Sequence, residues 1–188
     1  WWLAWVLLAL AVLTKGPVAV VLTGITLSLY ALIRRDLFGL WRLLRPIRGL
    51  LITAVLSLPW YLAELVVEGQ PFWDSFFGYH NLQRLTSVVN DHLQPWWFFG
   101  PVLVVASLPF TPLLLLGLAR CLAAFRGKGS RLQLPAQQSL RDFAGCWVLS
   151  LLILFTLAAT KLPSYWLPAT PAAALLIALT AQAPSLTR

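Results

Sequence analysis

Two short turns of the sequence share a pattern in which a lysine lies between an apolar run and a proline. They are Thr14-Lys15-x-Pro17 and Thr160-Lys161-x-Pro163. Proline suits the first turn of a helix, and the N–H groups and positive dipole end of such a turn attract anions. Two such turns at one membrane face would flank a phosphate group. Alternatively, each lysine only reaches the lipid headgroups and has no chemical role.

A second group of polar residues has side chains that bind phosphate or move protons. Arg84 lies four residues after His80, so on a helix the two would share a face. Arginine binds phosphate bidentately, and histidine can hydrogen-bond a phosphate, ligate a metal or shuttle a proton. Tyr165, just after the second lysine pattern, would offer a phenol to a ligand at the same face. A structural histidine and an ordinary interfacial aromatic residue remain alternative interpretations of His80 and Tyr165.

The elements that must position these residues are membrane-spanning helices. The 188 residues are 60% hydrophobic and 11% charged, with a mean hydropathy of +0.80, which excludes a water-soluble domain. Uncharged runs long enough to cross a bilayer predict an all-α, polytopic transmembrane helix bundle of about six spans and a single domain over residues 1–188. The runs cover residues 1–13, 16–33, 49–67, 96–119, 143–159 and 165–183. Because the chain starts inside an apolar run without methionine, we expect it to be the later part of a larger membrane domain.

The basic residues predict the orientation of these spans. Eleven of the 14 lysines and arginines fall in the segments 34–48 and 120–141 or at residue 188, which lie on one side of the alternation. Cytoplasmic loops of membrane proteins carry an excess of lysine and arginine. We therefore expect the chain to lie in the plasma (inner) membrane with both of its ends in the cytoplasm. Lys15, Arg84 and Lys161 then lie on the opposite face. Residues 37–48 repeat arginine at every third position among apolar residues, which predicts a short interfacial helix ending near Pro46.

Other chemistries are excluded or left without support by the same composition. The net charge of +8 lies in short loops between apolar runs, which fits a membrane surface rather than nucleic acid. Both cysteines fall at the predicted cytoplasmic end, so neither a disulfide nor a structural metal is expected. Glu64 is the acidic residue inside a predicted span, near its outer end. The sequence contains no phosphate-binding loop, dinucleotide fingerprint, nucleophile elbow or zinc-site spacing.

Five short motifs in this order resemble the polytopic GT-C glycosyltransferases related to the 4-amino-4-deoxy-L-arabinose lipid A transferase and the dolichyl-phosphate-mannose protein mannosyltransferases. The motifs are Leu13-Thr14-Lys15-Gly16-Pro17, Leu58-Pro59-Trp60-Tyr61, Tyr79-His80-Asn81-Leu82-Gln83-Arg84, His92-Leu93-Gln94-Pro95-Trp96-Trp97-Phe98, and Thr160-Lys161-Leu162-Pro163-Ser164-Tyr165-Trp166-Leu167-Pro168. The resemblance implies transfer of a sugar from a polyprenyl-phosphate donor to a lipid or protein acceptor at the extracytoplasmic face. It also implies that Lys15, Arg84 and Tyr165 face the donor cavity. His80 varies in the family, and Lys161 belongs to its motif with a less defined role.

The resemblance also defines what these residues lack. The acidic catalytic residue of the family is expected upstream of Trp1, so the general base is not assigned here and the segment alone should be inactive. A divalent metal is compatible with the family, but no residue here fixes one. A transporter or flippase for a lipid or sugar, with a basic outer vestibule, is the alternative. Transporters place polar groups near the midplane, and these spans show none, which favours the enzyme over the transporter. A purely structural subunit would leave the paired lysine turns unexplained.

Overall fold

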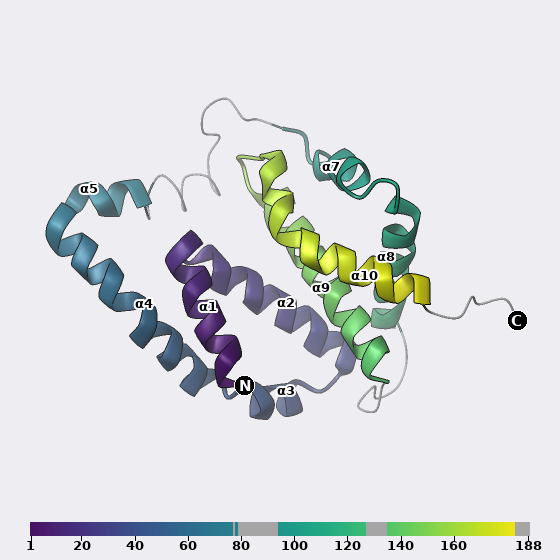
Figure 1. The fold of residues 1–188 in the computed structure, drawn as a ribbon, viewed down its shortest axis with the longest axis horizontal. Helices are drawn as coiled ribbons and strands as arrows, with labels where there is room; N and C mark the ends of the chain where they lie inside the picture. The colour runs from purple at the N-terminus through teal and green to yellow at the C-terminus, as the bar shows by residue number, and fades with distance from the viewer. Residues whose placement is uncertain (77, 79–93, 127–134, 183–188) are drawn as a thin grey trace, which may run out of the picture. The chain divides into compact units, whose positions relative to one another are not determined.

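The computed structural model describes residues 1–76, 78, 94–126 and 135–182, and its elements there are helices, which confirms the predicted all-α class (Figure 1). In chain order they are α1 (Trp2–Lys15), α2 (Val18–Arg34), α3 (Leu37–Leu44), α4 (Pro46–Glu68), α5 (Gln70–Phe72), α7 (Phe99–Ala106), α8 (Thr111–Arg126), α9 (Ala136–Leu157), the 3₁₀ helix η2 (Pro163–Ala169) and α10 (Thr170–Gln182). They form two compact units. The first holds Trp1–Gly24, Leu37–Leu93 and Ala158–Thr160, and the second holds Ile25–Asp36, Gln94–Leu157 and Lys161–Arg188.

Three helical segments in the described part of the chain are long and apolar enough to cross a membrane. They are Pro46–Glu68, Ala136–Leu157 and Pro163–Gln182, which combines η2 with α10. α1 and α2 are shorter apolar helices. These five segments match five of the six predicted spans, with boundaries displaced by a few residues. The largest displacement is at α9, which begins seven residues before the predicted start at residue 143.

The span over residues 96–119 was predicted to be kinked by its prolines, and the interruption goes further than a kink. The structure divides it into α7 and α8, and the helical pattern is interrupted between Ser107 and Phe110. Prolines at positions 109 and 112 have no backbone N–H, so a continuous helix would lack two of its backbone hydrogen bonds here. The Thr111 hydroxyl donates instead to the Val104 carbonyl at 2.8 Å, which satisfies one of the carbonyls that the break leaves open.

In the first unit, α1 packs along α4 through a stripe of small and polar residues (Figure 1). The buried residues of α4 recur every fourth position and are Gly49, Thr53, Ser57 and Tyr61. A Cβ on Gly49 would lie 1.9 Å from Cε2 of the Trp5 ring, so glycine is what lets the indole approach this backbone. The Trp5 ring N–H donates to the Leu44 carbonyl at 2.8 Å, and the Thr53 hydroxyl donates to the Trp5 carbonyl at 3.1 Å. Small residues and interhelical hydrogen bonds are what hold helices together in lipid.

In the second unit, α8, α9 and α10 pack against one another, again through glycines (Figure 1). A Cβ on Gly117 of α8 would lie 2.7 Å from the Thr180 hydroxyl of α10, and one on Gly145 of α9 would lie 2.7 Å from Cys121. The second half of α2 joins this unit through hydroxyl pairs. Thr26 hydrogen-bonds Ser150 at 2.6 Å and Tyr30 hydrogen-bonds Ser139 at 2.6 Å, both of these partners lying on α9.

Candidate functional site

The first lysine turn joins α1 to α2 and lies wholly in the first unit. Lys15 is the last residue of α1 and its side chain is exposed. Gly16 follows with φ of 78°, a backbone conformation that residues with a Cβ adopt rarely, and its N–H donates to the Val12 carbonyl at 2.7 Å. Within the described chain, no group accepts a hydrogen bond from the Lys15 ammonium. This charge is therefore available to a ligand.

The backbone of this turn differs from the sequence prediction. α2 begins at Val18, one residue after Pro17, so the predicted position of the proline near the helix start is confirmed. However, the N–H groups of Ala19 and Val20 donate to the Gly16 and Pro17 carbonyls at 3.2 and 3.0 Å. The prediction that first-turn N–H groups stay free for an anion is wrong for these two. The lysine side chain is left as the candidate anion-binding group of the turn.

Tyr61 of α4 supports this turn, and the sequence argument assigned it no role. Its buried hydroxyl donates to the Val12 carbonyl, the same oxygen that accepts the Gly16 N–H. The ring lies 5.4 Å from that of Phe76 and 6.5 Å from that of Phe72 between centroids. A tyrosine inside an apolar helix needs a partner for its hydroxyl, and that signal was present in the Leu58-Pro59-Trp60-Tyr61 motif. The structure thus links the first two motifs of the resemblance.

The second lysine turn has a different environment. Lys161 is only 8% exposed, whereas lysine is seldom fully buried without a partner. Among the described residues, no hydrogen bond or ion pair to its ammonium group is found, and the ammonium nitrogen is not one of the buried atoms that lack a partner. Leu162 is extended, with φ of −123° and ψ of 142°, and Pro163 then starts η2. A shielded lysine without an internal partner is what a site for an anionic ligand requires.

Tyr165 lies on η2, four residues after Lys161, in the same unit. Its half-buried ring stacks on Phe155 of α9, with centroids 4.6 Å apart and planes inclined by 30°. Its backbone N–H donates to the Leu162 carbonyl at 3.1 Å. The described part of the chain gives its hydroxyl no hydrogen-bond partner, so the ring is fixed while the phenol is free. Lys161 and Tyr165 are the two predicted site residues that the structure places in one segment.

The remaining predicted residues are not grouped by the structure. Lys15 belongs to the first unit and Lys161 to the second. His80 and Arg84 lie outside the described residues. Glu64 is half-buried on α4. In the part of the chain that the structure describes, no three His, Cys, Asp or Glu side chains cluster as a metal site would require.

Asp142 is a buried charge that the sequence argument placed in a loop. It lies within α9 and is fully buried, and the nearest guanidinium nitrogen of Arg141 is 3.6 Å from its carboxylate. Its backbone carbonyl accepts a weak hydrogen bond from the thiol of Cys121 at 3.7 Å, and both cysteines are free and buried. At 1.5 Å per residue, Asp142 lies about 22 Å along α9 from Leu157, the end that leads to Lys161. It is therefore distant from the lysine turn.

The chain is similar in sequence to several known membrane enzymes. No protein-family model matches the chain. An undecaprenyl phosphate-alpha-4-amino-4-deoxy-L-arabinose arabinosyl transferase of Pseudomonas aeruginosa is 35% identical over 172 residues, which are 88% of this chain and 28% of that protein. A second such transferase, from Sodalis glossinidius, is 35% identical over 182 residues, which are 93% of the chain and 30% of that protein. An uncharacterized protein of Aquifex aeolicus is 33% identical over 93% of the chain and 36% of its own length.

The comparison of structures agrees. The crystal structure of ArnT from Cupriavidus metallidurans, bound to undecaprenyl phosphate, matches with a TM-score of 0.74 at 28% identity, over 94% of this chain and 29% of that one. The chain is a homologue of the ArnT arabinosyl transferases. Its fold is accordingly that of a GT-C membrane protein, as the sequence motifs predicted. The chain spans about a third of the length of the relatives it matches, so the homology concerns that portion of them.

Proposed function

We propose that this chain is part of a membrane glycosyltransferase that moves a sugar from a polyprenyl-phosphate donor to a lipid or protein acceptor. The transfer takes place at the extracytoplasmic face of the plasma (inner) membrane. The basic loops and both ends of the chain are cytoplasmic in this proposal, because eleven of the 14 basic residues alternate to that side. Residues 1–188 then belong to one transmembrane domain.

One observation carries the proposal: a homologous solved structure with a TM-score of 0.74 has undecaprenyl phosphate bound. The chemistry of the second lysine turn supports it. Among the described residues, the buried Lys161 has no acceptor for its ammonium group, and Tyr165 is held by its ring with no partner for its hydroxyl. A phosphate monoester or diester supplies the acceptor oxygens that both groups lack. The exposed Lys15, at the equivalent Thr-Lys-x-Pro turn, adds a second cation.

The proposed mechanism is an inverting displacement at the anomeric carbon of the donor sugar. The acceptor oxygen forms the new bond while the bond from the anomeric carbon to the phosphate oxygen breaks, and polyprenyl phosphate leaves with the electron pair. Lys15, Arg84 and Lys161 stabilise the negative charge that grows on this phosphate, and His80 and Tyr165 hydrogen-bond to it. An acidic residue from the part of the protein that precedes Trp1 removes the acceptor proton.

The lysines favour a transferase over a transporter. Transporter sites combine broken helices with polar groups near the bilayer midplane. Here the lysines lie at the ends of helices: Lys15 ends α1, and Lys161 precedes η2 by two residues. A lysine at the end of a membrane helix is in a position to bind a leaving phosphate at the membrane surface. The buried hydroxyls of Thr26 and Ser150, which lie inside helices, are paired with each other.

The experiment that tests the proposal measures sugar transfer by the whole protein in nanodiscs, with a polyprenyl-phosphate sugar as donor. We expect Lys15→Ala and Arg84→Ala to abolish transfer while membrane insertion stays intact. Loss of one phosphate contact should lower transition-state stabilisation by about 2 to 4 kcal/mol. Arg126→Ala, at the exposed end of α8, is the matched control and should keep full activity.

Two results would contradict the proposal. Near-normal transfer in both variants would show that neither cation meets the donor phosphate. Movement of the intact lipid-linked sugar across the bilayer, without transfer to an acceptor, would identify a flippase instead.

A further inference from the structure

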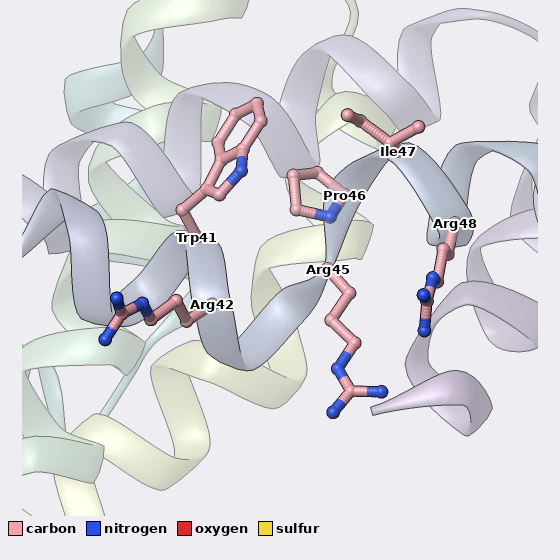
Figure 2. A pocket seen from close by; sticks show the side chains of 6 residues that line it. All are labelled: Trp41, Arg42, Arg45, Pro46, Ile47 and Arg48. Carbon is pink, nitrogen blue, oxygen red and sulfur yellow. The ribbon is translucent and has the colours of Figure 1, made fainter.

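The junction of α3 and α4 forms a second basic site, separate from the lysine turns. A cavity of about 420 Å³ lies here, lined by Trp41, Arg42, Arg45, Pro46, Ile47 and Arg48 (Figure 2). We call residues 41–48 the α3–α4 corner. α3 ends at Leu44, Arg45 adopts the left-handed conformation with φ of 48° and ψ of 58°, and α4 starts at Pro46. The sharp change of direction at Arg45 brings side chains of both helices to one cavity.

Three positively charged side chains line this corner. Arg42, Arg45 and Arg48 line the cavity, and the sequence has no acidic residue from Leu37 to Ala63. In the described chain none of the three has a salt-bridge partner. Aromatic rings hold two of them in place: the guanidinium of Arg42 lies 4.2 Å from the ring centroid of Phe38, and that of Arg45 lies 5.4 Å from the ring of Trp1.

The first turn of α4 adds to the positive electrostatic potential of the corner. Pro46 is in its first turn, and no side chain caps the N-terminus of this 23-residue helix. Its positive dipole end therefore faces the corner that the arginines line. Like charges that line one site repel one another, and an anion bound among them reduces that repulsion. An anion such as a phosphate group matches the positive charge of the cavity.

The corner also has an apolar side, which restricts what carries the phosphate. Figure 2 shows the guanidinium groups on one side of the backbone and the side chains of Trp41, Pro46 and Ile47 on the other. Trp41 is 57% and Ile47 75% exposed, and α3 has no buried residue at all. Exposed apolar groups beside arginines are typical of a helix lying in a membrane interface. An occupant that satisfies both sides has an anionic headgroup and hydrocarbon chains.

We propose that the α3–α4 corner binds the headgroup of an anionic phospholipid from the surrounding leaflet. Arg42, Arg45 and Arg48 contact the phosphodiester, and Trp41 and Ile47 pack against its acyl chains. The site is independent of the donor-phosphate site, because it lies at the start of α4 whereas Tyr61 and the first lysine turn lie near its end. Binding there would fix the angle at which α4 enters the membrane.

The test is lipid retention by the whole purified protein, measured by native mass spectrometry. The probes are phosphatidylglycerol and phosphatidylcholine with the same acyl chains. We expect phosphatidylglycerol to bind more tightly, and the triple variant Arg42→Gln, Arg45→Gln, Arg48→Gln to weaken it about tenfold. The matched control, Arg126→Gln, Lys128→Gln, Arg131→Gln, removes the same charge from another predicted cytoplasmic loop and should bind as the unmodified protein does.

A second measurement needs no variant. Phosphatidylglycerol carrying a photoreactive group near its headgroup should label residues 37–50 of the unmodified protein. The proposal is overturned by labelling elsewhere, by equal losses in both triple variants, or by equal retention of the two lipids. It is also overturned if soluble glycerol 3-phosphate displaces the lipid at equal concentration, since the corner would then be a site for a soluble anion.

Discussion

Replacing Lys161 with methionine removes the charge of the second lysine turn and leaves its largely buried, unbranched stem. Lys161 is 8% exposed, so most of that stem contacts protein rather than solvent. Methionine is flexible and similar in length, and it refills such space with little rearrangement. Alanine would instead leave a cavity and mix a packing defect with the loss of charge. The variant Lys161→Met therefore isolates what the ammonium group does.

The expected size of the effect follows from the absence of an internal partner. A hydrogen bond to a charged group contributes about 1.5 to 3 kcal/mol, so a lost phosphate contact should lower kcat/KM about 10- to 150-fold. Stability should not follow activity. Among the described residues the ammonium group has no hydrogen bond or ion pair to lose, so its removal should leave thermal stability unchanged.

The assay combines both readouts on the whole protein in nanodiscs. Transfer is followed at varied donor concentration, and thermal unfolding is followed by tryptophan fluorescence. Lys128→Met, in a predicted cytoplasmic loop, is the control and should change neither quantity. Unchanged kcat/KM in Lys161→Met would refute the phosphate contact. A parallel fall of activity and stability would show that the lysine is structural, with an acceptor that the fold itself supplies.

Three further experiments test the helix packing that positions the candidate site. Tyr61→Phe removes the hydroxyl bonded to α1 and should lower stability by about 1 kcal/mol and reduce transfer; unchanged melting would show that this bond is not formed. Gly49→Ala should destabilise by about 1 to 3 kcal/mol, because its methyl group meets an indole ring, whereas Gly24→Ala, which meets open space, should be neutral in the same melts. Thr26→Val with Ser150→Ala, in a double-mutant cycle, should give a coupling of about 0.6 kcal/mol, and a coupling of zero would contradict the 2.6 Å contact.

The span pattern was predictable because hydropathy acts locally. A run of apolar residues must become a helix in lipid, since no water is present to satisfy its backbone. The break between α7 and α8 was only partly predictable. Prolines at 101, 109 and 112 all permit a kink, but the structure interrupts the helix at Ser107–Phe110 and keeps Pro101 and Pro112 within helices. Which proline ends a helix depends on the neighbours that accept or donate in its place.

The sequence predicted which residue types belong to the candidate site, but it did not predict how buried or how hydrogen-bonded each of them is. The repeated Thr-Lys-x-Pro pattern indicated two equivalent lysines. The structure makes them unequal, because Lys15 is exposed at the end of α1 and Lys161 is buried before η2. Tyr61 was part of a quoted motif, yet its hydroxyl bond to Val12 joins residues 49 positions apart. Local sequence patterns do not reveal a contact between residues this far apart.

The sequence by itself determined that the chain is a set of membrane helices joined by basic loops, and it predicts an orientation in which Lys15, Arg84 and Lys161 lie opposite those loops. Composition and spacing contain that information, because each span is stable in lipid through its own backbone hydrogen bonds. Only the tertiary structure decided which lysine is shielded, that Gly49 admits the Trp5 ring, and that three arginines meet at one corner. Burial and convergence are properties of residues brought together from different helices, and side-chain packing between helices sets them.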